Sequence, residues 1–211
     1  MNLTNDYVFR GISQTDAKPA IQASVGYTHN LGPYGISLSA WGSNVEFNDV
    51  DEATVEFDYT LDISRSVGGK NGVDLSGGFI YYDYPGATGS LNYDYLELYI
   101  SASFDVKIAS TTIGLNGSPD YFGNSGTFFY PYLDVSVPVG KYLDLSAHVG
   151  YNSIRDAAAF GQDSYIDYSF SLGANVAGVD VGLAYTDTDL EETACDSTAC
   201  GSIVVSVSKS F

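Results

Sequence analysis

Residues 53–64, "ATVEFDYTLDIS", decide the fold, because apolar and polar side chains alternate along the whole stretch. Successive side chains of a strand point to opposite faces, so the pattern predicts a strand with one apolar face and one acidic face. The chain ends on a similar pattern in residues 200–211, "CGSIVVSVSKSF". In the stretch 53–64, the apolar face holds Val55, Phe57, Tyr59, Leu61 and Ile63, and the polar face holds Glu56, Asp58, Thr60, Asp62 and Ser64.

Alternation of this kind recurs along the chain and predicts twelve strands. The connections after even-numbered strands are short, at about 30–33, 68–71, 105–106, 140–142 and 177–178, and the others are longer. Transmembrane barrels show this asymmetry, and an even strand count lets the first and last strands pair and remove both edges. The expected strands cover about 3–13, 20–30, 34–45, 53–64, 72–84, 94–105, 107–116, 127–139, 142–151, 164–176, 179–186 and 200–211.

The solvent that meets the apolar face separates two fold classes. In a soluble β-sandwich this face would fill a core, whereas in a membrane barrel it would meet lipid. The polar face is rich in Ser and Gly, and the apolar face has Tyr and Phe near the strand ends, as the interfacial girdles of a barrel require. We therefore predict that residues 1–211 form one all-β domain, a twelve-stranded antiparallel transmembrane β-barrel. Short turns would be periplasmic, longer loops extracellular, and both termini periplasmic.

The charge balance is strongly acidic and excludes one class of partner. The chain has 8 Lys and Arg against 26 Asp and Glu, a net charge of −18, so it offers no basic surface for nucleic acid. The alternation places ten acidic residues on the inner face, with Arg10 and His148 as the main basic groups there. The ten acidic residues expected to line the lumen are Asp6, Glu56, Asp58, Asp62, Asp74, Glu97, Asp134, Asp144, Asp167 and Asp180.

A part of the chain at about residues 3–64 resembles a known family. Residues 5–27, "NDYVFRGISQTDAKPAIQASVGY", followed by "WGSNVEF" at 41–47 and the alternating stretch 55–64, are similar to the TorF-type porin family of Proteobacteria. The resemblance implies a signal peptide, which is absent from this sequence, and a location in the bacterial outer membrane. Its expected partners are outer-membrane lipid, lipopolysaccharide and the assembly machinery. The terminal Phe211 resembles the aromatic signal that this machinery reads, although Lys209 departs from the usual hydrophobic residue.

Few residues indicate catalysis or a cofactor. Cys195 and Cys200 are expected to form a disulfide in the last long loop, since neighbouring residues are small or acidic and no His lies near them. His148 shares a strand face with Asp144 and Ser146, and neighbours two residues apart on one face lie roughly 7 Å apart, too far for a ready hydrogen-bonded relay. We therefore expect no enzyme activity, no metal and no cofactor.

The sequence leaves two main functions open. The first is a narrow porin, through whose acidic lumen small cationic or neutral solutes would pass. The second is a non-conducting surface barrel that acts through its acidic loops in adhesion, envelope structure or partner binding. An inward-folded plug would separate them. The sequence offers loop 117–126, or the side chains Trp41, Tyr82, Tyr99 and Tyr132, as groups that could close the lumen.

Overall fold

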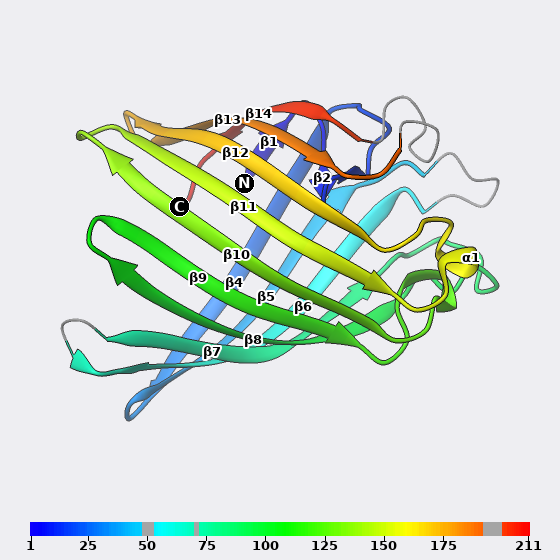
Figure 1. Ribbon diagram of the computed structural model, residues 1–211, viewed down its shortest axis with the longest axis horizontal. Helices are drawn as coiled ribbons and strands as arrows, with labels where there is room; N and C mark the ends of the chain where they lie inside the picture. Colours follow the sequence, from blue (N-terminus) through cyan, green and yellow to red (C-terminus); the bar gives the residue numbers. More distant parts are fainter. Residues whose placement is uncertain (48–52, 70–71, 192–199) are drawn as a thin grey trace.

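The computed structural model describes residues 1–47, 53–69, 72–191 and 200–211, and these form a closed antiparallel barrel (Figure 1). The order around the barrel is β1-β14-β13-β12-β11-β10-β9-β8-β7-β6-β5-β4, which confirms the predicted fold of twelve strands. The strands are β1 (Asn2–Thr4), β4 (Ala20–Leu31), β5 (Tyr34–Asn44), β6 (Val55–Val67), β7 (Val73–Asp83), β8 (Tyr95–Val106), β9 (Ala109–Ser118), β10 (Phe128–Val139), β11 (Leu143–Ile154), β12 (Tyr165–Val176), β13 (Val179–Thr188) and β14 (Ser202–Ser208).

Short turns gather at one end of the barrel and long loops at the other (Figure 1). The described loop residues include two short helices, η2 (Phe122–Asn124) and α1 (Ala157–Phe160). Among the described residues, none of the helices is long and apolar enough to cross a membrane. One predicted turn was wrong, because β8 continues through Val106 and the chain reverses at Lys107 and Ile108. Lys107 has a φ of +59° there, and a sequence does not predict this left-handed conformation at a lysine.

The predicted first strand over 3–13 was wrong in extent. Only Asn2–Thr4 joins the barrel, where β1 pairs with both β4 and β14. The chain then leaves the wall and forms a small hairpin from β2 (Val8–Phe9) and β3 (Ile12–Ser13). Its turn residues Arg10 and Gly11 have φ values of +49° and +80°, the left-handed geometry of a tight two-residue hairpin. Glycine at the second position adopts this conformation without strain.

Strand β10 retains both of its prolines. Its register with β11 is the same on either side of Pro131, so the strand has no bulge there. Only Tyr130 and Pro131 have no paired residue in β11. Pro138 pairs with Asp144 inside the strand, which ends one residue later. At the other end of the chain, β14 ends at Ser208, so Phe211 lies beyond the last strand and is fully exposed.

The two faces of the barrel differ in composition. Apolar side chains cover the outer surface: in β6, Phe57, Tyr59 and Ile63 are exposed, and the neighbouring Leu38 and Phe79 on β5 and β7 are also exposed. Inward positions of β6 hold Glu56 and Asp58 instead. Surface of this kind over most of a barrel is suited to hydrocarbon, because contiguous apolar patches are small on water-soluble monomers.

Leu61 tests which solvent the outer face meets. It lies near the middle of β6 and pairs with the outward-facing Leu38 and Phe79. We expect Leu61→Arg to lower the free energy of unfolding in a lipid bilayer by roughly 2–4 kcal/mol, measured by denaturant titration in vesicles. The neighbouring Thr60→Arg, which points inward, is the matched control and should cost less. Equal costs would contradict the assignment of the faces.

Candidate functional site

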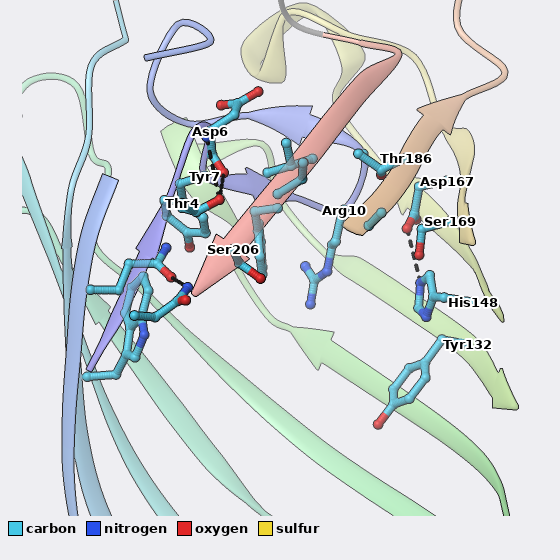
Figure 2. A pocket seen from close by; sticks show the side chains of 18 of the residues that line it. Thr4, Asp6, Tyr7, Arg10, Tyr132, His148, Asp167, Ser169, Thr186 and Ser206 are labelled. Carbon is cyan, nitrogen blue, oxygen red and sulfur yellow. Dashed lines mark hydrogen bonds and ion pairs between the residues drawn. The ribbon is translucent and has the colours of Figure 1, made fainter. Parts of the chain in front are cut away.

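The N-terminal segment 5–19, here called the plug hairpin, enters the barrel, where Asp6 and Thr15 are buried. It leaves the wall beside β14 and β1 and reaches β8 and β10 on the opposite side of the lumen. Figure 2 shows the side chain of Arg10 projecting from this segment into the lumen. A chain that crosses the lumen from one wall to the other divides the interior in two.

The tip of the plug hairpin is held by a buried ion pair. Arg10 donates to Glu97 on β8 through two parallel bonds, Nη1 to Oε1 at 2.7 Å and Nη2 to Oε2 at 2.8 Å. The two side chains are 5% and 0% exposed. Asn116 on β9 donates a third hydrogen bond to Glu97 at 2.8 Å, so the carboxylate is well satisfied. Paired, bidentate geometry of this kind is what a buried carboxylate needs to remain charged.

Aromatic rings surround the guanidinium of Arg10. Its Cζ lies 4.2 Å from the ring centroid of Tyr130, 4.6 Å from that of Phe9 and 4.8 Å from that of Phe128. Burial disfavours the charge, but Glu97 outweighs this effect and raises the pKa of Arg10 well above its ordinary value. The guanidinium therefore stays protonated at neutral pH.

Polar contacts hold the base of the plug hairpin. The buried carboxylate of Asp6 accepts hydrogen bonds from Ser13 at 2.6 Å, Thr15 at 3.0 Å and Ser202 at 2.9 Å. Ser202 belongs to β14, so this contact ties the plug hairpin to the barrel wall. On its other side, the ring of Tyr7 packs edge-on against Trp41 at 5.3 Å.

Three cavities follow one another along the barrel interior. The outer pocket, about 320 Å³, lies between the loops and includes Phe9, Phe47, Tyr93, Phe122 and Glu46. The inner cavity, about 640 Å³, lies on the other side of the plug hairpin and includes Phe9, Arg10, Tyr132, His148 and Asp167 (Figure 2). The turn-side pocket, about 460 Å³, is lined mainly by serines together with Asp134 and His148. Phe9 thus separates the first two cavities, and His148 and Ser169 line both of the last two.

His148 is the centre of a charged cluster on the cavity wall. Its Nδ1 lies 2.6 Å from Asp134 on β10, and its Nε2 lies 3.1 Å from Asp167 on β12. Tyr130 lies 2.7 Å from the same Nε2 and donates to Asp167 at 3.0 Å. The hydrogen bonds described for His148 go to carboxylates and a phenol, and none goes to a serine, so the described residues form no Ser–His–Asp triad.

The ten predicted acidic residues do not form one continuous ring. Glu56 and Asp58 are packed beside the plug hairpin, where Tyr7 donates to Glu56 at 3.4 Å, and one oxygen of each has no hydrogen-bond partner in the described structure. Asp62 accepts from Tyr99 at 2.8 Å and from Ser76. Asp74, Asp144 and Asp180 lie exposed near the turn end. The remaining members are Asp6 and Glu97, which hold the plug hairpin, and Asp134 and Asp167, which hold His148.

Sequence reasoning missed the partners of Arg10 and His148. Arg10 finds Glu97, which is 87 residues away, and His148 finds carboxylates on both neighbouring strands. Knowledge of the cross-strand register would have predicted a partner of His148, since Asp134 pairs directly with it. The side chains suggested for closing the lumen do line it: Trp41 and Tyr82 contact Tyr7 and Phe9 of the plug hairpin.

Two predicted features stay predictions. Cys195 lies outside the described residues, so the predicted disulfide with Cys200 has no described geometry. The role of Phe211 in assembly rests on its sequence alone. Among the described residues, no group of three or more His, Cys, Asp or Glu side chains is placed to hold a metal ion.

Together, the fold and the interior define an all-β, twelve-stranded closed antiparallel barrel whose lumen is crossed by the plug hairpin. The chain belongs to the Gcw_chp family, described as "Bacterial protein of unknown function", whose model matches residues 1–211. The comparison with curated proteins found no match.

Solved barrels share the fold at low sequence identity. The NanC porin is 12% identical over 100% of this chain and 99% of its own, with a TM-score of 0.61. The COG4313 outer membrane channel from Pseudomonas putida F1 is 7% identical over 98% and 92%, with a TM-score of 0.62. LpxR from Salmonella typhimurium is 9% identical over 100% and 98%, with a TM-score of 0.55. These similarities concern the fold alone.

The Arg10–Glu97 pair should control the stability of the plug hairpin. Arg10→Met leaves a buried carboxylate unpaired, so we expect the free energy of local opening to fall by about 3–5 kcal/mol. Hydrogen exchange of the amides in β2 and β3 measures this opening. The exposed Lys18→Gln is the control and should leave their exchange near the wild-type rate. Unchanged exchange in Arg10→Met would show that the ion pair does not hold the hairpin in place.

Proposed function

We propose that this protein is a passive channel of the bacterial outer membrane for small, preferentially cationic or neutral solutes, kept closed at rest by the plug hairpin. The observation that supports it most is the row of three cavities along the barrel axis, interrupted by one short segment near Phe9 and Arg10. The apolar outer surface, the resemblance to TorF-type porins and the shared fold of solved outer-membrane channels support the location.

The closed state follows from how the plug hairpin is held. Its tip is fixed by a bidentate ion pair and its base by Asp6, whereas its secondary structure consists of two residues in each strand. A hairpin this small has little stability of its own, and therefore its contacts with the wall keep it in place. Loss of these contacts would join the outer pocket to the inner cavity.

Charge along the path favours cations over anions. Asp62, Asp134 and Asp167 lie on the inner face, and the protein as a whole carries a net charge of −18. Low-dielectric walls focus such a field and raise the local concentration of cations. Arg10 and His148 offset part of it, but each is paired with at least one carboxylate.

Conduction in a planar bilayer tests the closed state. We expect the wild-type barrel to open rarely and briefly, and the double variant Arg10→Ala/Glu97→Gln to open for longer, because it releases the tip without leaving a buried charge. Tyr142→Ala at the turn end is the control and should behave as wild type. Equal, continuous conductance in all three would mean that the plug hairpin does not close the path. Absence of conductance in all three would favour the non-conducting surface barrel.

Reversal potential across a salt gradient tests selectivity in the opened variant. We expect a cation-selective potential at neutral pH that declines as pH falls, because protonation removes the negative charge of the carboxylates. High salt should weaken it by screening. Asp62→Asn/Asp134→Asn should reduce the preference more than Asp187→Asn/Asp189→Asn near the loops, where water screens the charge. An anion-selective potential would overturn the acidic-path model.

A further inference from the structure

We propose that the outer pocket is a binding site for an organic ammonium ion, a cation with apolar substituents. The pocket lies on the loop side of the plug hairpin and has a volume of about 320 Å³, within the range of small-molecule sites, roughly 300–1,000 Å³. This inference goes beyond channel activity, since binding here does not require that the barrel conduct.

The walls of the outer pocket are mainly aromatic. Tyr93 and Phe122 stack with their ring centroids 4.3 Å apart, and Phe47 meets both of them edge-on, at 5.6 and 5.8 Å. Tyr95 and Tyr121 continue the wall towards the lumen with a further edge contact at 4.7 Å. The face of an aromatic ring attracts a cation, and a cage of such faces is a known way to hold an ammonium group that carries methyl or alkyl groups.

The polar part of the outer pocket carries negative charge. Asp16 and Glu46 contribute to the lining, and the described lining residues include no Lys or Arg. Lys18, which lies next to the pocket, contacts Asp16 at 3.2 Å and also Glu46, so an ammonium group already fits between these carboxylates. Two carboxylates against one lysine leave a net negative charge at the rim. Aromatic walls with an acidic rim match an organic cation better than an anion or a purely apolar ligand.

The floor of the outer pocket belongs to the plug hairpin. Phe9, Ile12, Ser13 and Gln14 all line it, so a bound ligand would touch the segment that separates the two halves of the lumen. A ligand that binds while the plug hairpin is in place stabilises that state by its own binding free energy. An organic ammonium ion would therefore hold the plug hairpin closed.

Saturation-transfer NMR on the full chain in detergent tests the site with three probes. Choline is the cation, 3,3-dimethylbutan-1-ol is its neutral isostere of the same shape, and maltose represents neutral saccharides. We expect choline to bind roughly tenfold more tightly than the isostere, with its N-methyl signals shifted upfield by the ring currents of the cage. Equal binding of choline and isostere would reduce the pocket to an apolar cavity and overturn the proposal. Binding of maltose without choline, or of no probe at all, would also overturn it.

Four variants separate charge from shape. Glu46→Gln should weaken choline binding and leave the isostere unchanged, whereas Lys18→Gln, which removes the competing ammonium, should strengthen choline binding. Phe122→Leu keeps an apolar side chain but removes a ring face, so it should weaken choline by roughly three- to tenfold. Asp144→Asn, at the turn end, is the control and should change neither ligand. Opposite or absent effects at Glu46 and Lys18 in a folded barrel would contradict a cation site.

Discussion

Closure of the barrel depends on the three residues Asn2–Thr4. They pair with β14 on one side and β4 on the other, so they complete the ring of backbone hydrogen bonds. A wall surrounded by apolar medium needs every backbone group paired, because an open edge has no water to satisfy it. Asn5 extends this closure past the end of β1: its backbone N–H donates to Val205, and its side-chain oxygen accepts from the N–H of Val205 at 2.6 Å.

The shortness of β1 determines how the interior is built. Because the wall needs so few residues from the N-terminus, the following segment is free to enter the lumen. There it supplies an apolar ring, Phe9, and a charge, Arg10, to an interior that the strands line with acidic and aromatic side chains. The buried Glu97 would be costly without this partner, and Arg10 would be costly without Glu97. The wall and the plug hairpin therefore depend on each other.

Much of the fold could be predicted from the sequence, and the interior could not. Alternation in stretches such as 53–64 defines strands and faces, because the side-chain period of a strand is two and depends on neighbours alone. The same rule assigned residues 3–13 to a strand. Those residues do alternate in part, but the wall strand ends at Thr4 and the chain then turns back at Arg10–Gly11. The partner that holds this turn, Glu97, lies 87 residues away. Similarly, the partners of His148 come from adjacent strands, whose register is a property of the assembled sheet. Contacts of this range have no local signature.

The position of the plug hairpin in the chain has a consequence for the order of folding. Its base bonds to Ser202 and its tip to Glu97, so its two anchors are separated from it by 196 and 87 residues. Contacts of such sequence separation form late, because the chain entropy of closing long loops has to be overcome first. Although it precedes most of the barrel strands in the chain, this segment is thus expected to be among the last to become ordered. Until the strands around it have closed, the plug hairpin lacks both of its anchors, and the barrel interior reaches its final shape only when Ser202 and Glu97 bind it.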